Sequence, residues 1–276
     1  MLPSFKRLRA ALLDKMNSRE TVLITGASSG IGLELAKCFA ADGSRLILVA
    51  RNKDALEKLA EELRQKHKIE TIVLPADLSL PEAPKQIFDS LAAQKISVDV
   101  LVNNAGFGLH GKFLEMSLSR QLEIIKVNVN ALVELTGLFL PGLVERRAGG
   151  IFNVGSVAGF VPGPGLAIYY ATKAFVQSFS EALSEELAGT GVSVTVLCPG
   201  PTETNFGAVA RGEKVRVVQT KKMSAEEVAR TGYAAFRNKK VISVPGLQNK
   251  AMILAARLAP RSMVRRIVKK YNTFKI

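Results

Sequence analysis

The chain has 276 residues, 47% of them apolar, which is enough to bury a complete hydrophobic core. It has no run of about 18 uncharged apolar residues, and its basic first 20 residues lack a continuous apolar segment, so we expect neither a spanning helix nor a secretory signal. The net charge of +14 is concentrated at the ends, because residues 1–20 carry +3 and residues 228–276 carry +12.

Short β-branched runs alternate with helical periodicity from residue 21 to about residue 244. The expected strands are Thr21–Thr25, Arg45–Ala50, Glu70–Pro75, Val98–Val102, Gly150–Gly155, Val192–Leu197 and Val241–Val244. The expected helices include Leu33–Ala41, Asp54–Lys66, Ser117–Arg147 and Ile168–Ala188. Apolar strands separated by helices are typical of a parallel sheet covered on both faces. We therefore predict a single doubly wound α/β domain of about seven strands, with its ligand site at their carboxyl ends.

The first expected strand runs into a glycine-rich turn, Gly26-Ala27-Ser28-Ser29-Gly30-Ile31-Gly32, which opens a helix. Glycines let the backbone approach a pyrophosphate, and the helix N-terminus supplies free N–H groups and a partial positive charge. A glycine-rich turn in this context predicts a dinucleotide-binding loop.

The second expected strand is followed by Arg51, with Lys53 close by, and not by an acidic residue. An acid at this place usually accepts a hydrogen bond from a free ribose 2′-OH, whereas a 2′-phosphate requires a cation. A planar guanidinium suits a phosphate, so we predict NADP(H) and not NAD(H). The other interpretation is a solvated arginine in an ordinary loop.

Tyr169 and Lys173 are four residues apart and therefore lie on one face of a helix. We expect the nearby ammonium to lower the pKa of the phenol toward neutrality, where it can exchange a proton with a carbonyl or alcohol oxygen. The two cysteines, Cys38 and Cys198, and two distant histidines give no metal-ligand spacing, so we expect reduced thiols and no metal.

Taken together, these motifs resemble the classical short-chain dehydrogenase/reductase family. The resemblance covers about residues 20–245, and its remaining motifs are Asn103-Asn104-Ala105-Gly106, Asn128, Ser156 and Pro199-Gly200. It implies a Rossmann fold and an oxidoreductase acting on CH–OH groups. Tyr169 would be the general acid or base, Ser156 would bind the substrate oxygen, and Lys173 would lower the Tyr169 pKa and bind the nicotinamide ribose. Asn128 would hold a water that links Lys173 to solvent.

The resemblance also implies a cofactor site. Its residues are Gly26, Ser28, Ser29, Gly30, Ile31, Gly32, Arg51, Asp77, Leu78, Asn104, Ala105, Gly106, Tyr169, Lys173, Pro199, Gly200, Thr202 and Thr204. In it Asp77 would bind the adenine, and Thr204 the nicotinamide amide.

The loops expected over the nicotinamide are 107–113, 159–166 and 205–223. The first two are rich in Phe, Leu, Val and Pro, which favours a hydrophobic carbonyl or alcohol substrate. The third contains glycines and many charges, and we expect it to be a mobile lid. His110 is either a substrate contact or a solvated loop histidine.

The two ends flank the catalytic domain as a basic amphipathic segment at 1–19 and a basic helical extension at 246–276. Met263, Val264, Ile267, Val268 and Tyr271 form one apolar stripe, opposed by arginines and lysines. Packing on the body or on a second subunit is the first interpretation, an anionic membrane surface the second, and nucleic acid the third. No nucleic-acid motif supports the third, so we expect no nucleic-acid partner.

The leading functional hypothesis is a cytoplasmic, NADPH-dependent carbonyl reductase, with peripheral membrane contact as a further property of the basic ends. An oxidative alcohol or hydroxysteroid dehydrogenase is one alternative, and a membrane-associated dinucleotide-binding protein with little catalysis is another. The resemblance further implies a homo-oligomer, a dimer or tetramer packed through the long helices.

Overall fold

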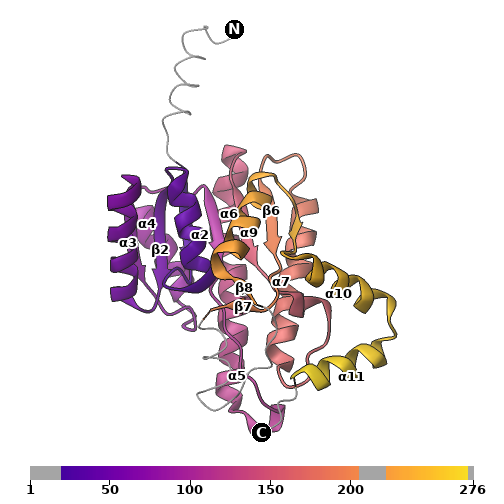
Figure 1. The fold of residues 1–276 in the computed structure, drawn as a ribbon. Coiled ribbons are helices and arrows are strands. Elements are labelled where there is room, and N and C mark those ends of the chain that lie inside the picture. The colour runs from indigo at the N-terminus through magenta and orange to yellow at the C-terminus, as the bar shows by residue number, and fades with distance from the viewer. Residues whose placement is uncertain (1–19, 205–221, 273–276) are drawn as a thin grey trace.

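The computed structural model describes residues 20–204 and 222–272 (Figure 1). Its centre is a seven-stranded sheet in the order β3-β2-β1-β4-β5-β6-β9, with every neighbouring pair parallel. The strands are β1 Thr21–Thr25, β2 Arg45–Ala50, β3 Thr71–Pro75, β4 Val100–Asn103, β5 Gly150–Val154, β6 Ser193–Leu197 and β9 Ile242–Ser243. The order reverses between β1 and β4, which confirms the predicted doubly wound topology and places a ligand crevice at the carboxyl ends of these strands.

Helices cover both faces of the sheet. They are α2 Gly30–Ala41, α3 Lys53–His67, α4 Ala83–Ala93, α5 Leu118–Ile125, α6 Ala131–Arg146, α7 Ala167–Glu186, α9 Ala225–Arg237, α10 Leu247–Leu258 and α11 Arg261–Asn272. Short turns of 3-10 helix lie at η1 Phe113–Glu115 and η3 Val157–Phe160, and a π-helix, η2 Lys126–Asn130, joins α5 to α6. Buried side chains of α2, α3 and α9 pack on one face of the sheet, and those of α4, α6 and α7 on the other.

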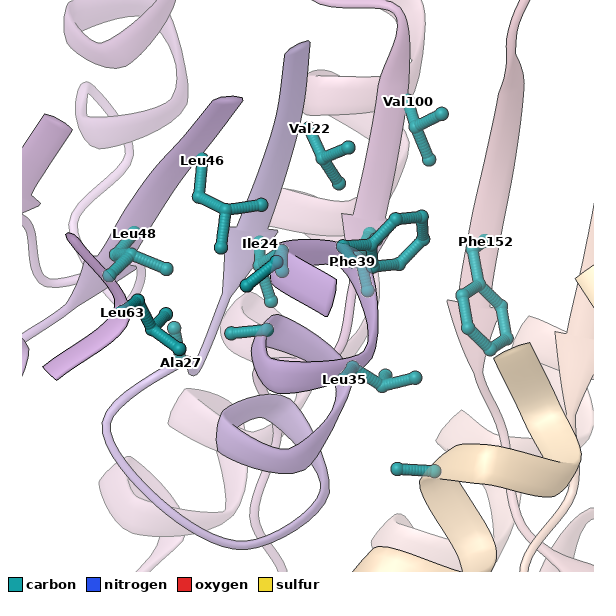
Figure 2. Close-up of a cluster of buried hydrophobic side chains, with 14 of the residues drawn as sticks. Val22, Ile24, Ala27, Leu35, Phe39, Leu46, Leu48, Leu63, Val100 and Phe152 are labelled. Atoms are coloured by element: carbon teal, nitrogen blue, oxygen red, sulfur yellow. The ribbon is translucent and has the colours of Figure 1, made fainter. Parts of the chain in front are cut away.

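Alternating side chains of each strand supply the two cores. Val22 and Ile24 of β1 point toward α2 (Figure 2). Leu23 between them belongs to the core on the opposite face. Phe39 of α2 is fully buried and packs edge-on against Phe236 of α9 at 6.0 Å between ring centres. Each fully buried side chain of this size stabilises the fold by about 1.5–3 kcal/mol, so the core fixes the strand ends that carry the site.

The helical segment Leu118–Arg146 is long and apolar enough, by length and composition, to cross a membrane, although one charge, Glu134, interrupts its most apolar part. Its α6 portion buries Leu135, Phe139 and Leu143 against the sheet together with α4. These contacts identify α6 as a core helix of the α/β domain.

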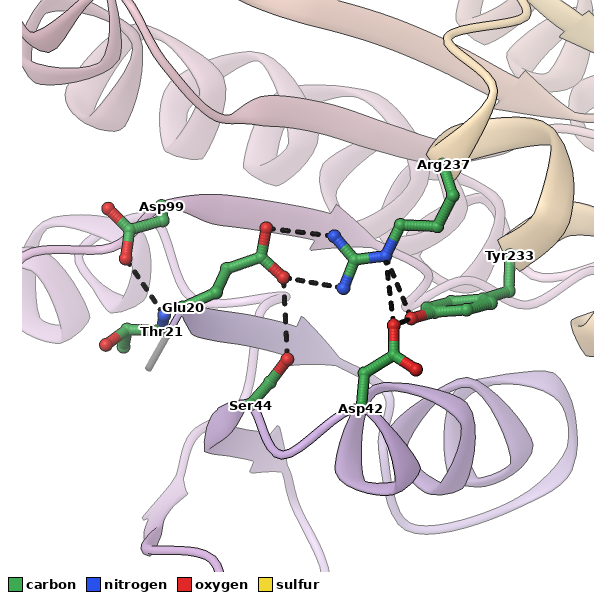
Figure 3. A network of polar contacts seen from close by, with 7 residues as sticks. All are labelled: Glu20, Thr21, Asp42, Ser44, Asp99, Tyr233 and Arg237. Atoms are coloured by element: carbon green, nitrogen blue, oxygen red, sulfur yellow. Dashed lines mark hydrogen bonds and ion pairs between the residues drawn. The ribbon is translucent and has the colours of Figure 1, made fainter. Parts of the chain in front are cut away.

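A polar network fixes α9 at the amino ends of the strands (Figure 3). Arg237 donates to both carboxylate oxygens of Glu20, at 3.0 and 2.7 Å, and its Nε lies 3.5 Å from a carboxylate oxygen of Asp42. Tyr233 donates to the same Asp42 carboxylate. Because Glu20 precedes β1 and Asp42 ends α2, these contacts join α9 to the edge of the domain opposite the carboxyl ends of the strands.

Two sequence expectations lie outside the described residues: the amphipathic segment at 1–19, and nearly all of the lid at 205–223. Next to the two ends of the second segment, β7 Thr202–Glu203 pairs in parallel with β8 Met223–Ser224. Strands of two residues show no periodicity, which is why the sequence did not predict this small sheet.

Candidate active site

The glycine-rich turn between β1 and α2 has the backbone shape that a phosphate loop requires. Gly26 and Gly30 have φ angles of +66° and +57°, in the left-handed region that favours glycine. Ser29, the N-cap of α2, makes no side-chain bond to the helix, and the first turn of α2 contains no acidic residue. Its N–H groups and partial positive charge therefore suit an anionic ligand such as a pyrophosphate.

Asn104, directly after β4, braces this loop. Its side-chain amide donates to the carbonyls of Thr25 and Gly26 at 2.9 and 3.2 Å. The Thr25 hydroxyl accepts from the backbone N–H groups of Asn104 and Ala105, each at 3.0 Å. A Cβ on Gly26 would come within 2.8 Å of the Asn104 amide nitrogen, so the two segments can approach this closely only with glycine.

The predicted adenosine-side residues lie at the ends of neighbouring strands. Arg51 follows β2 and is exposed, and Asp77 follows β3, the strand paired with β2. Desolvation raises the pKa of Asp77, but hydrogen bonds from Ser79 and the charge of Arg51 outweigh it, so the net shift is downward. One Ser79 bond, from its backbone N–H to Asp77 Oδ1, is 2.9 Å long. A cation and an ionised carboxylate therefore stand together where the sequence predicted the ribose and adenine.

Ser156, Tyr169 and Lys173 meet at the carboxyl end of β5. Ser156 follows β5 and hydrogen-bonds Tyr169 of α7. The Ser156 Oγ also accepts from the Ala158 N–H at 3.1 Å, which begins η3 and orients the hydroxyl. Lys173 Nζ lies 5.9 Å from the centre of the Tyr169 ring and donates to the Val154 carbonyl at 2.7 Å.

Burial is the largest cause of the pKa shifts of Tyr169 and Lys173. It raises the pKa of Tyr169 to about 12, against a smaller lowering by the Ser156 hydrogen bond. It lowers the pKa of Lys173 to about 8, against a smaller raising effect of Cys198. The prediction that the Tyr169 pKa falls toward neutrality is therefore wrong for the chain alone, because desolvation by burial shifts that pKa upward.

Asn128 lies in the π-helix η2, where one wide turn interrupts the α5–α6 run. Its amide donates to the Phe107 carbonyl and the Thr172 hydroxyl and accepts from the Phe107 N–H, all at 3.0 Å. A Cβ on Gly106 would lie 3.0 Å from Asn128 Oδ1 and 3.5 Å from Lys173 Nζ. The structure thus brings Asn128, Lys173 and the Asn104–Gly106 segment together, and π-helical turns are frequent at functional sites.

The predicted segment after β6 closes the site next to the phosphate loop. The Pro199 carbonyl accepts from the Val157 N–H at 3.0 Å, which ties this segment to η3. The Thr202 hydroxyl donates to the Gly200 carbonyl at 2.9 Å. A Cβ on Gly30 would lie 3.0 Å from the Thr204 methyl carbon, so Thr204 packs against the glycine turn.

Sequence reasoning missed a buried polar chain beneath the site. Asn103 donates to Thr136 at 3.2 Å and to Asn153 at 3.0 Å, and Asn153 donates to Ser180 at 2.9 Å. This chain joins α6, β4, β5 and α7. Its signal in the sequence is the single asparagine in each of two otherwise apolar strands, which must find partners when buried.

The lowered pKa of Lys173 predicts a pH-dependent stability of the cofactor-free protein. Between pH 8 and 10.5 the unfolded chain keeps a proton on this lysine that the folded chain has lost, so stability rises with pH. Lys173→Met removes this contribution, and its stability relative to the natural protein should fall by on the order of 3 kcal/mol over that window. Urea unfolding at several pH values measures the difference. Lys58→Met, at an exposed lysine of α3, is the control and should show none.

Comparison with known proteins agrees with this geometry. Residues 20–235 match the family model of the short chain dehydrogenases. The chain is 43% identical over 195 residues to sulfoacetaldehyde reductase 2 of Chromohalobacter salexigens, covering 70% of this chain and 77% of that protein. It is 40% identical over 176 residues to a very-long-chain 3-oxoacyl-CoA reductase of Laccaria bicolor, covering 62% of this chain and about half, 52%, of that protein.

Solved structures give the same result. A short-chain dehydrogenase from Sphingobium yanoikuyae in complex with NADPH has a TM-score of 0.77 and 34% identity, covering 86% of this chain and 94% of that one. A short chain dehydrogenase/reductase from Burkholderia phymatum in complex with NAD has a TM-score of 0.77 and 27% identity, covering 87% and 93%. The fold, the glycine turn and the matched residues show that the chain belongs to the short-chain dehydrogenase/reductase family.

Proposed function

We propose that this protein is an NADP(H)-dependent oxidoreductase that interconverts a carbonyl group and an alcohol on a hydrophobic substrate. Membership of the family supports oxidoreductase chemistry on such groups. The observation that carries the proposal is that Ser156, Tyr169 and Lys173 lie close together, with Lys173 near Gly106. The hydrogen bond from the Ala105 N–H to the Thr25 hydroxyl joins the segment that contains Gly106 to the phosphate loop.

The residues present fit a dinucleotide phosphate. The glycine turn leaves a cradle at the N-terminus of α2, and the exposed Arg51 guanidinium at the end of β2 suits a 2′-phosphate. When bound, the cofactor supplies the hydride or accepts it. Tyr169 and Lys173 would hold the nicotinamide ribose, and the segment 199–204 would hold the nicotinamide end.

The chain's own residues handle the proton. With its pKa raised to about 12, Tyr169 keeps its proton at neutral pH and can donate it to a substrate oxygen. Ser156, hydrogen-bonded to Tyr169, stabilises the same oxygen as negative charge develops on it. Lys173 stands close enough to favour the phenolate electrostatically once the proton has left. Asn128 would hold a water through which Lys173 and Tyr169 recover a proton.

The substrate side is apolar. Phe107, Phe160, Val161 and Leu166 are partly buried in the two loops beside Tyr169. Apolar side chains in these loops favour a hydrophobic substrate, and Phe160 also packs against the core. The similarity to the Laccaria bicolor very-long-chain 3-oxoacyl-CoA reductase supports the same class, in which a long acyl chain would lie along these loops.

Tyr169→Phe tests the assignment of the proton donor. Because general acid–base catalysis contributes about 10²–10⁴-fold, kcat should fall by at least about a hundredfold while the dissociation constant for NADPH stays nearly unchanged. NADPH oxidation with ketones, aldehydes, quinones, 3-ketoacyl thioesters and steroids measures kcat, and fluorescence titration measures cofactor binding. Tyr170→Phe, at the neighbouring ring, should keep most of kcat. Full activity of Tyr169→Phe would exclude the mechanism.

Arg51→Asp tests the cofactor preference. Replacing the cation by a carboxylate removes a charge-assisted phosphate contact of about 1.5–3 kcal/mol and repels the 2′-phosphate, so the ratio of kcat/KM for NADPH over NADH should fall at least tenfold. Lys66→Asp, at the far end of α3, makes the same charge change away from the site and should leave the ratio unchanged. An unaltered ratio in Arg51→Asp would show a solvated surface arginine.

We further propose a homo-oligomer. Leu118 and Leu122 of α5 and Phe175 of α7 are 62%, 47% and 41% exposed, on two helices that pack against each other. Apolar side chains gathered on one helix pair favour burial against a second copy. Multi-angle light scattering of the purified chain gives its mass in solution, and a monomer would contradict this proposal.

We also propose a cytoplasmic protein that contacts anionic membranes through α10 and α11. Of the predicted stripe on α11, Val264 is buried, while Met263 and Ile267 are 53% and 55% exposed beside Arg266 and Lys270. After Glu227 the chain contains no acidic residue. Apolar side chains flanked by cations suit the surface of an anionic bilayer.

Vesicle flotation tests the membrane contact. The full chain should bind vesicles that contain phosphatidylserine and not vesicles of phosphatidylcholine alone, and added salt should release it. The double variant Arg266→Glu/Lys270→Glu should lose most of this binding. The same charge change on α3, Lys58→Glu/Lys66→Glu, should keep it. If the α11 variant and the α3 variant bound the vesicles equally well, the membrane contact would not be made by Arg266 and Lys270.

A further inference from the structure

Asn272, at the end of α11, is 6% exposed and makes three polar contacts far from its own helix. Its side-chain amide donates to the Pro164 carbonyl at 3.0 Å and accepts from the Tyr170 hydroxyl at 3.3 Å. Its backbone carbonyl lies 2.7 Å from Nε2 of His110. A carbonyl can only accept, so His110 donates through Nε2 in this contact.

These contacts tie α11 to both apolar loops beside the catalytic tyrosine. The loops are also bonded to each other, because the Gly111 N–H donates to the Gly165 carbonyl at 2.9 Å. Gly163 packs directly on the Tyr170 ring, where any Cβ would collide with ring carbons. The loop at 107–112, the loop at 161–166 and the end of α11 therefore form one continuous structure, which we name the substrate-side wall.

The substrate-side wall adjoins the reacting group. Tyr170 follows Tyr169 in α7, and their rings meet edge-on with centres 6.1 Å apart. The hydrogen bond from the Tyr170 hydroxyl to Asn272 fixes the orientation of the ring that packs edge-on against Tyr169. The described polar contacts of Asn272 are with the two loops and with Tyr170, so it acts through other residues.

We propose that Asn272 is a positioning residue that makes α11 part of the substrate site by holding both loops and Tyr170 in place. The inference rests on the proposed function and adds that substrate affinity depends on the C-terminal helix. A buried amide that donates to one segment and accepts from another fixes the relative position of the two segments. Its removal leaves the Pro164 carbonyl and the Tyr170 hydroxyl without this hydrogen-bond partner. A residue that only packed α11 on the body would require neither the amide nitrogen nor the amide oxygen of Asn272.

Asn272→Ala tests the proposal in the full chain by steady-state kinetics. The substrate KM should rise about five- to tenfold, as expected for the loss of buried hydrogen bonds, with a smaller change in kcat and no change in NADPH affinity. Tyr170→Phe, which removes one of the bonds, should raise KM less. The double variant should match Asn272→Ala alone, because both changes break the same contact. Arg265→Ala, an exposed position of α11, is the matched control and should leave KM unchanged.

A second measurement does not depend on turnover. Hydrogen exchange of the backbone amides at 107–112 and 161–166 should become faster in Asn272→Ala, while exchange in the phosphate loop at 26–32 stays as in the natural protein. Arg265→Ala should leave both regions unchanged. If the natural protein oxidises no NADPH with any substrate but these loops still lose protection in Asn272→Ala, the proposed function fails and the role of Asn272 in the wall stands.

Two results would overturn the proposal. One is a lower melting temperature of Asn272→Ala with unchanged substrate KM and unchanged exchange in both loops, which would mean a purely structural contact. The other is an equal loss of substrate and NADPH affinity, which would place the effect in the cofactor site. If Asn272→Ala does not fold, an unchanged KM and unchanged loop exchange in Tyr170→Phe would overturn it instead.

Discussion

A buried amino group has to find an acceptor, and in this protein that requirement joins α7 to the sheet. Lys173 is 6% exposed, and its Nζ donates to the carbonyl of Val154, the last residue of β5. Since unpaired buried cations are very costly, α7 cannot rotate or slide without losing this bond. Tyr169 lies one turn before Lys173 and Ser156 lies two residues after Val154. The one contact therefore sets the distance between the hydroxyl groups of the proposed site.

The same burial determines the ionisation of the group. Desolvation raises the pKa of Tyr169 to about 12 and lowers that of Lys173 to about 8, so at neutral pH the phenol keeps its proton and the lysine is still mostly charged. A protonated phenol beside a substrate oxygen is prepared to act as an acid, which is the role that carbonyl reduction requires. In oxidation the phenol must first lose its proton, and the hydrogen bond from Ser156 is the interaction that lowers its pKa. The electrostatics of the chain thus agree with the reductive direction that the arginine at the end of β2 suggests.

Much of the fold could be read from the sequence, because its signals are local. β1 and β2 match their predicted bounds, since apolar β-branched runs end abruptly at glycine or at charged residues. The close approach of Ser156, Tyr169 and Lys173 was also predictable, because two of them share a helix face and the third ends a neighbouring strand. The direction of the Tyr169 pKa shift was not. It depends on how deeply the ring is buried, which spacing along a helix does not show.

Contacts between distant segments were beyond the sequence for the same reason. Asn128 could be named from the family motif, but nothing local predicts the π-helical turn that presents its amide to Phe107 and Thr172. Asn272 is 162 residues from His110 and 102 from Tyr170, and its own surroundings read only as the end of a basic amphipathic helix.

The amphipathic pattern of the C-terminal extension is only partly buried against the body. The apolar stripe of α11 is split between two sides of the helix. Val264 is buried on the inward side, and Met263 and Ile267 are exposed beside basic residues. The buried Asn272 lies near the inward edge of the helix, so the same packing that fixes α11 on the body brings its amide to the two loops. Because the contacts of Asn272 with the loops and Tyr170 are polar, the attachment of α11 to these loops depends on hydrogen-bond geometry, which is why a single amide can decide it.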